Sequence, residues 1–185
     1  MNNTNLTQLS IAGKVINDIL PGIFEYMSSL ELLDLSDNKT DHLNSAVFSG
    51  LGAFSGLTNL ERLSMKANEI TDILPGTFEN TSSLEYLVLS YNEISEIMSG
   101  TFENLSSLEY LDLGYNKIKH LNIAVFSGLG TFNGLTNLER LSMTGKEITE
   151  ILPGTFEYMS SLERLDLSVN NLRLLDSAVF SGFVN

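Results

Sequence analysis

The sequence predicts an elongated solenoid of seven stacked repeats, each contributing one short strand to a parallel sheet. A nine-residue pattern with leucine at its first, fourth and sixth positions recurs along almost the whole chain. The alternation of these leucines is typical of a strand with one buried face. A phenylalanine follows every copy of the pattern. Because one such strand cannot bury its apolar face by itself, stacked copies must bury it between them.

The pattern is clearest in residues 108–116, which read Leu-Glu-Tyr-Leu-Asp-Leu-Gly-Tyr-Asn. We expect a strand in every copy, parallel to its neighbours and about 4.8 Å from them. The repeat runs without interruption, so we expect residues 1–185 to form a single domain, with 30-residue repeats at 30–59 and 108–137 and steps of 24 residues elsewhere. The copies begin at Leu6, Leu30, Leu60, Leu84, Leu108, Leu138 and Leu162.

The ninth position of the pattern is asparagine in five copies, where the chain turns out of the strand. An amide side chain donates and accepts hydrogen bonds, so it can satisfy backbone groups of the turn and of the next coil. Lysine replaces it at Lys14 and Lys146, where we expect local irregularity. The asparagines are Asn38, Asn68, Asn92, Asn116 and Asn170.

The phenylalanines that follow the pattern predict a second interior column, on the side away from the sheet. Counted forward from each copy, they are Phe24, Phe48, Phe78, Phe102, Phe126, Phe156 and Phe180. In the two longer repeats a Phe-Ser/Asn-Gly-Leu segment occurs twice, starting at 48 and 54 and at 126 and 132. We expect the additional phenylalanine and leucine to be buried beneath a longer convex bulge. A ligand-binding loop is the alternative, which the glycine-rich and apolar composition favours less.

This combination of pattern and spacing resembles the typical 24-residue class of the leucine-rich repeat family, over residues 6–183. Residues 73–80, Ile-Leu-Pro-Gly-Thr-Phe-Glu-Asn, look like repeats of Toll-like receptor ectodomains and lamprey variable lymphocyte receptors. The resemblance implies an α/β fold: a right-handed, horseshoe-shaped solenoid with a parallel sheet on its concave face and loops and short helical turns on its convex side. It also implies an extracellular or cell-surface location and a protein-binding role.

Composition narrows the possible partners. The net charge of −13 argues against nucleic acid, which requires a basic surface. No apolar run approaches the roughly 20 residues of a membrane span, so we expect no membrane insertion. Residues 1–5 contain neither the basic region nor the apolar core of a signal peptide. The absence of cysteine excludes thiolate and disulfide chemistry, and departs from the cysteine-bearing caps that are usual in extracellular relatives.

Positions three, five, seven and eight of the pattern are expected to face solvent on the concave side. They place four tyrosines on the two central strands, with an arginine one strand away on either side. Tyrosine and arginine are enriched at the energetic centres of protein interfaces, so the first hypothesis is a protein-binding scaffold. The alternative is that the tyrosines stack across strands and only stabilise the sheet. The predicted contact residues are Arg62, Tyr86, Tyr91, Tyr110, Asp112, Tyr115 and Arg140.

Chemistry beyond binding has little support in the sequence. The second position forms a row of glutamates that could suggest calcium, but the carboxylates lie along a line rather than around a point, which favours a solvated edge. His42 and His120 are 78 residues apart at equivalent repeat positions and cannot converge. No acid, base and nucleophile come together, so we expect no enzyme, no cofactor and no metal site.

The second hypothesis is head-to-tail self-assembly into filaments. Uncapped ends of a repeat array expose core surface and an unpaired edge strand. The 24 residues from Leu162 to Asn185, followed by the five that precede Leu6 in a second copy, give 29, close to a 30-residue repeat. The predicted assembly residues are Leu6, Leu9, Ile11, Leu165, Leu167, Phe180 and Phe183.

Overall fold

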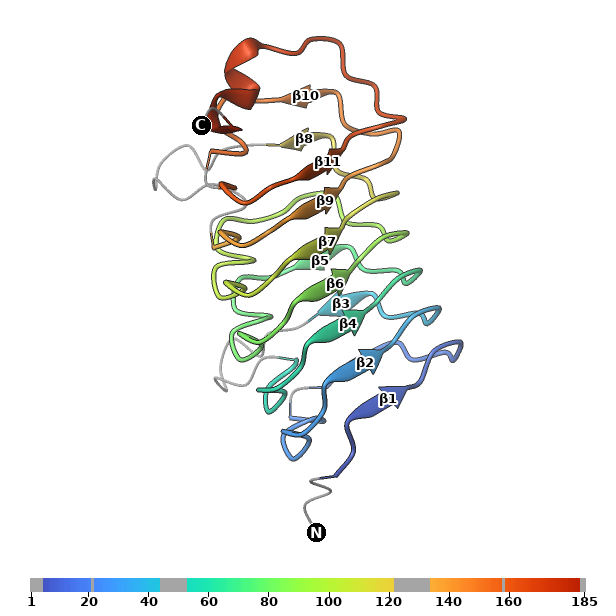
Figure 1. The fold of residues 1–185 in the computed structure, drawn as a ribbon. Helices are drawn as coiled ribbons and strands as arrows, with labels where there is room; N and C mark the ends of the chain where they lie inside the picture. Colours follow the sequence, from blue (N-terminus) through green and yellow to red (C-terminus); the bar gives the residue numbers. More distant parts are fainter. Residues whose placement is uncertain (1–4, 21, 44–52, 122–133, 158, 184–185) are drawn as a thin grey trace.

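The computed structural model describes residues 5–20, 22–43, 53–121, 134–157 and 159–183. Its main element is a parallel sheet of seven strands in the order β1-β2-β4-β6-β7-β9-β11, one strand from each repeat (Figure 1). This arrangement confirms the predicted fold class. The strands are β1 (Gln8–Ser10), β2 (Leu32–Asp34), β4 (Arg62–Ser64), β6 (Tyr86–Val88), β7 (Tyr110–Asp112), β9 (Arg140–Ser142) and β11 (Arg164–Asp166).

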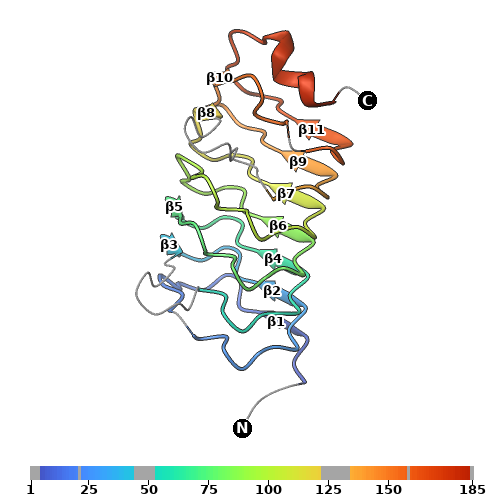
Figure 2. The same cartoon turned by 90° about the vertical axis from the view of Figure 1, so that its left-hand side faces the viewer.

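The opposite side of the stack is built mainly from turns. Two short parallel sheets lie there, β3 (His42–Leu43) with β5 (Asp72–Ile73) and β8 (His120–Leu121) with β10 (Glu150–Ile151). Figure 2 shows these pairs across the stack from the main sheet. A 3-10 helix, η1 (Ser177–Phe183), is the one helix in the described part of the chain. We call the solvent-facing side of the main sheet the concave face.

The strand leucines form the interior of the solenoid. In the five central strands the middle residue is at most 1% exposed. Burying one such side chain stabilises the fold by about 1.5–3 kcal/mol. The buried middle leucine therefore fixes each strand to the interior, and the side chains on either side of it in the strand face solvent. These middle residues are Leu33, Leu63, Leu87, Leu111 and Leu141.

The phenylalanine column contains Phe54 from the first of the two longer repeats and Phe183 at the last repeat. Phe54, expected as an additional residue, stacks between Phe24 and Phe78, with ring centroids 6.4 and 5.8 Å away. Phe48 and Phe126 lie outside the described residues. At the last repeat it is Phe183, rather than Phe180, whose ring lies against the Phe156 ring, at 6.0 Å.

The turn that leads into the next strand explains why Phe54 lies in the column. The Leu57 amide donates to the Phe54 carbonyl and the Leu60 amide to the Leu57 carbonyl. The same pair of bonds follows Phe24, through Met27 and Leu30. The distance from the column residue to the next strand is therefore constant. The six inserted residues precede Phe54, so Phe54 stands at the same distance before Leu60 as Phe24 does before Leu30.

The predicted bonds of each asparagine to its own coil are confirmed, but the second coil that it bonds is the preceding one and not the next. The Asn92 amide nitrogen donates to the Leu89 carbonyl of its own coil and the Met65 carbonyl of the preceding coil, both at 3.0 Å. Its oxygen accepts from the Ile70 amide of the preceding coil at 3.1 Å. Bonds of the same kind, to their own and the preceding coil, are made by Asn38, Asn68, Asn116 and Asn170. We call this series the asparagine ladder.

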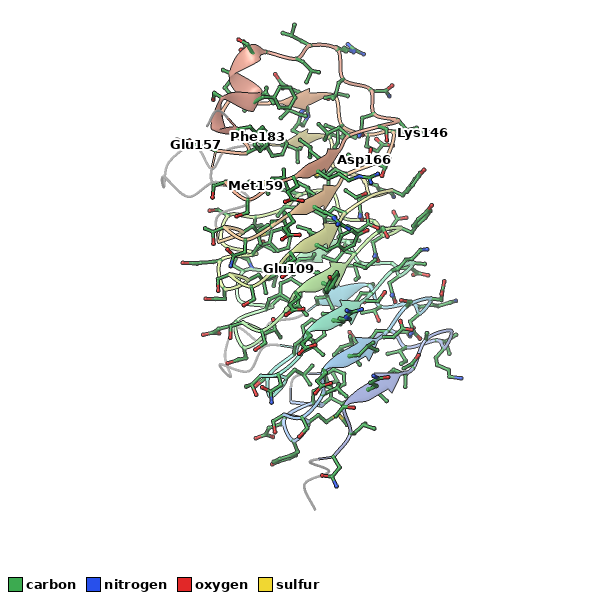
Figure 3. The ribbon with its side chains drawn as sticks, viewed as in Figure 1. Glu109, Lys146, Glu157, Met159, Asp166 and Phe183 are labelled. Atoms are coloured by element: carbon green, nitrogen blue, oxygen red, sulfur yellow. The ribbon has the colours of Figure 1, made fainter. Side chains whose placement is uncertain are left out.

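The asparagine ladder is interrupted at Lys146, as expected from the sequence. Asn92 and Asn116 are only 5% and 8% exposed, whereas Lys146 is exposed at the outer edge of its coil (Figure 3). A small interior hollow remains, lined among others by Asn116, Ile118, Met143 and Asn170. A lysine side chain has no acceptor for a backbone amide, so it cannot replace the missing carboxamide.

Replacing Lys146 with asparagine should raise the free energy of unfolding by about 1–2 kcal/mol, because it adds buried hydrogen bonds worth about 0.5–1.5 kcal/mol each. The matched loss is Asn92→Ala, which leaves backbone groups of two coils unpaired and should lower stability by about 3 kcal/mol. Urea unfolding measures both. No gain from Lys146→Asn alongside a large loss from Asn92→Ala would contradict the role given to the interruption.

Candidate binding surface

The sheet register brings the predicted contact residues together. Arg62 is paired with Tyr86, Tyr86 with Tyr110, and Tyr110 with Arg140, so the third positions form one continuous row across four strands. The fifth positions form a parallel row: Ser10, Asp34, Ser64, Val88, Asp112, Ser142 and Asp166. Two tyrosines therefore lie at the centre of the concave face, flanked by arginine on both sides, in the predicted order.

The four tyrosines form two pairs between neighbouring coils. Tyr86 and Tyr110 have ring centroids 6.1 Å apart and are tilted by 33°. Tyr91 and Tyr115, in the turns after β6 and β7, are stacked at 4.5 Å with 17° between their planes. The second pair is also exposed, at 49% and 44%. Stacking, the alternative interpretation, thus occurs together with a large accessible aromatic surface, and each stack adds about 0.5–1.5 kcal/mol.

Two cations of the third repeat extend this aromatic surface. The Arg62 guanidinium carbon lies 4.5 Å from the centre of the Tyr86 ring, and the Lys66 ammonium lies 5.2 Å from that of Tyr91. Contacts of this kind are worth about 0.5–1 kcal/mol at exposed sites. Lys66 was missed from the predicted contact residues. Its place at the seventh position, directly before a solvent-facing eighth position, was a usable signal.

The turn after each strand sets where Tyr91 and Tyr115 point. Both residues have left-handed backbone conformations, with φ of 58° and 54°. The same conformation occurs at the eighth position of other coils, at Asp37, Ala67 and Val169, so it belongs to the repeat rather than to the tyrosines. A non-glycine residue pays about 1–2 kcal/mol for it. The repeat therefore holds its eighth side chain in a defined outward direction at some cost in stability.

Carboxylates of the fifth position are held by the turns that follow them. Asp34 accepts hydrogen bonds from the Ser36 amide at 3.0 Å and from the Ser10 hydroxyl at 3.2 Å. Burial alone would raise the pKa of Asp34, but the hydrogen bonds from Ser36 and Ser10 outweigh it and lower that pKa below its ordinary value. Hydrogen bonds from the Ser168 side chain and amide likewise lower the pKa of Asp166. Both carboxylates stay charged near neutral pH.

The surroundings of Tyr110 favour the neutral form of its hydroxyl. Burial, followed by the nearby charge of Asp112, raises its pKa above the ordinary value, and Arg164 and Arg140 offset part of that rise. The hydroxyl therefore remains protonated over the physiological range. It can donate a hydrogen bond at the centre of the surface.

A hollow of about 370 Å³ opens on the concave face beside the tyrosines. It lies across β2, β4, β6 and β7, where the small side chain of Ser64 stands between larger neighbours. Its lining is mostly apolar, with one carboxylate and one guanidinium. The lining residues are Leu32, Leu33, Asp34, Ser36, Arg62, Leu63, Ser64, Tyr86, Val88 and Tyr110.

Comparison with known proteins agrees with this architecture. A family model described as leucine rich repeat matches residues 4–53, 51–94, 82–131 and 136–185. The chain belongs to the leucine-rich repeat family. No curated protein matches it. Among solved structures, an LRR protein of Leptospira interrogans is similar, with a TM-score of 0.71 and 28% identity over 91% of this chain. The match covers 38% of that protein's chain.

Membership of the family has functional consequences at a coarse level. Leucine-rich repeat proteins commonly act as protein-binding scaffolds and are generally not enzymes. Within the described residues, no group of three or more His, Asp or Glu side chains is arranged to hold a metal ion. None of the described helices is long and apolar enough to cross a membrane.

The two ends of this leucine-rich repeat stack expose apolar surface. The strand leucines Leu9 and Leu165 are only partly buried, unlike their counterparts in the central coils, and the same holds for Leu6, Ile11 and Leu167. At the far end Phe183 covers Phe156 and contacts Phe180, which remains 37% exposed. Exposed apolar side chains of the end coils include Val15, Leu20, Ile23, Val169, Leu174 and Leu175.

Val169→Gly should raise the free energy of unfolding by about 0.5–1 kcal/mol, because glycine adopts the left-handed conformation without the steric cost of a β-branched residue. Val169 is 56% exposed, so little burial is lost. Val169→Ala is the control, since it shortens the side chain but keeps most of the backbone strain. Chemical unfolding measures both, and a glycine variant no more stable than the alanine variant would contradict the strain.

Proposed function

We propose that this chain is a non-enzymatic scaffold that binds a protein partner through its concave face. The observation that carries the proposal is the stacked, half-exposed pair of Tyr91 and Tyr115 beside the Tyr86 and Tyr110 pair. The proposed contact residues are those predicted from the sequence, Arg62, Tyr86, Tyr91, Tyr110, Asp112, Tyr115 and Arg140, together with Lys66. We also propose that residues 1–185 act as a single domain.

The physical argument is preorganisation. The rings are held in place before binding, by stacking, by cation contacts from Arg62 and Lys66 and by the backbone of the turns. A partner therefore loses less free energy to side-chain ordering when it covers them. Tyrosine combines apolar area with a polar group, which suits the centre of an interface. The surrounding aspartates and arginines supply a charged rim that selects partners by complementarity.

The double substitution Tyr91→Ala with Tyr115→Ala should weaken partner binding by about 30-fold or more, as expected for loss of about 2 kcal/mol at an interface centre. The partner is first captured from the source organism with the unaltered chain and identified. Its dissociation constant is then measured by calorimetry for each variant.

Met98→Ala is the matched control, because Met98 is an exposed apolar residue that lies between β6 and β7 in the chain and outside the main sheet. It should leave the dissociation constant unchanged. Unfolding curves of the double variant must show an intact fold. Full affinity in a folded Tyr91→Ala, Tyr115→Ala variant, or loss of affinity with Met98→Ala, would exclude the concave face as the binding site.

A second candidate function is head-to-tail assembly, supported by the apolar surface of the end coils. Leu20 and Leu174 are 64% and 77% exposed, at opposite ends of the stack. A coil from a second copy would cover these side chains and continue the parallel sheet beside β1 or β11. The predicted assembly residues Leu6, Leu9, Ile11, Leu165, Leu167, Phe180 and Phe183 lie on these end surfaces, where they are partly buried or exposed.

If the ends assemble, the mass measured by light scattering should increase with protein concentration, and Leu174→Asp should return it to that of the single chain, 20.4 kDa. The charge would be buried without a partner in the joint, which is strongly unfavourable. Met98→Asp is the control for charge alone and should assemble like the unaltered chain. A constant mass of the single chain at all concentrations would exclude this candidate.

A further inference from the structure

The hollow on the concave face has a composition that selects for a particular side chain. Ser64 is paired with Asp34 on one side and Val88 on the other, Leu32 and Val88 supply apolar lining, and Tyr86 and Tyr110 also line the hollow. Asp34 lines the same space with an ionised carboxylate. An occupant that fits must therefore place apolar atoms between the walls and a polar group next to this carboxylate.

The cations nearest to Asp34 point away from it. Arg62 and Lys66, both from the third repeat, lean towards the next coil, over Tyr86 and Tyr91. Asp34 accepts hydrogen bonds from the Ser10 hydroxyl and the Ser36 amide, and it forms no salt bridge within the described part of the chain. Its charge is thus stabilised by neutral donors and, among the described residues, has no paired cation.

We propose that the hollow takes a lysine or arginine side chain of the protein partner, with the aliphatic stem between Leu32 and Val88 and the cationic head at Asp34. This inference rests on the proposed binding function of the concave face and names the partner chemistry. A partner that covered Asp34 with apolar groups would bury an unpaired charge, which is costly. A cationic head removes that cost, and the long stem buries apolar area.

The charge distribution favours a cation over an anion in this position. Arg62 also lines the hollow, but its guanidinium is engaged with the Tyr86 ring at 4.5 Å. Asp37 follows β2 in the neighbouring turn and adds negative charge on the Asp34 side. The whole chain carries a net charge of −13, which attracts a basic partner from a distance. The fifth-position residues of β4 and β6, Ser64 and Val88, are neutral. The Asp34 carboxylate is therefore the main charge among the fifth-position residues that line the hollow.

The test uses three unbranched probes with five carbon atoms each and different polar groups: n-pentylamine, pentanol and pentanoate. Methyl NMR signals of Leu32 and Val88 are followed while each probe is added to the intact chain. The amine should shift both methyl signals in a saturable way, and pentanol and pentanoate should bind at least about tenfold more weakly, as expected for loss of one charge-assisted contact.

Asp34→Asn should weaken amine binding by about tenfold, because asparagine can still accept from the Ser36 amide but carries no charge. Asp166→Asn is the matched control, at the same repeat position in β11 and with the same type of bond from Ser168, and should leave amine binding unchanged. Ser64→Leu fills the hollow and should abolish the shifts for every probe. Unfolding curves establish that each variant is folded.

Equal binding of pentanol and pentylamine, tighter binding of pentanoate, or unchanged amine binding by a folded Asp34→Asn variant would each overturn the inference. These results do not involve the partner protein. They are therefore separate from the tyrosine experiment: failure of the probes leaves the concave face as a binding surface, whereas full affinity of the tyrosine variant removes the proposed function itself.

Discussion

One buried carboxamide per coil connects most of the described repeats to the repeat before them. The asparagine nitrogen satisfies a carbonyl of its own strand and a carbonyl of the preceding strand, and its oxygen satisfies an amide of the preceding coil, as at Asn92. Backbone groups in the interior of a solenoid have no access to water, so leaving them unpaired would cost more than the bond itself contributes. The constant spacing of strands, and therefore of everything displayed on the sheet, depends on this interaction. Where Lys146 replaces the asparagine, the buried carboxamide is missing. The lysine side chain is exposed there, and a small interior hollow remains.

Buried leucines and asparagines hold the coils together. The solvent-facing positions can therefore vary without disturbing the fold. Positions three and five carry leucine, arginine, tyrosine, serine, valine or aspartate in different coils without altering the register. The eighth position keeps its left-handed backbone whether it holds alanine, tyrosine or valine. The repeat therefore separates stability from recognition. A binding surface arises where neighbouring coils happen to carry compatible side chains, as the stacked tyrosines of the fourth and fifth repeats do.

The proposed function follows from an uneven distribution of charge over this surface. Cations of the third repeat turn towards the tyrosines, which joins basic and aromatic groups into one patch at the centre. Asp34 of the second repeat faces the hollow and accepts hydrogen bonds from neutral donors, the Ser10 hydroxyl and the Ser36 amide. A partner that covers the tyrosines at its centre and places a basic side chain at the hollow would complement both the aromatic patch and the carboxylate. The end coils also expose apolar side chains such as Leu20 and Leu174, which suits stacking of another coil.

The sequence by itself determined the number of strands, their order and register, the asparagine ladder and the row of tyrosines and arginines, because a period of 24 or 30 residues leaves only one way to stack identical patterns. Three features needed the tertiary structure. Phe54 joins the column because the turn before the next strand has a fixed length, which spacing from the previous strand does not reveal. Arg62 and Lys66 could have leaned towards the aspartates of the second repeat or the tyrosines of the fourth, and only the packing of neighbouring coils decided between them. The hollow exists because a serine lies between larger residues from other coils, a relation between positions 24 to 30 residues apart that no local pattern contains.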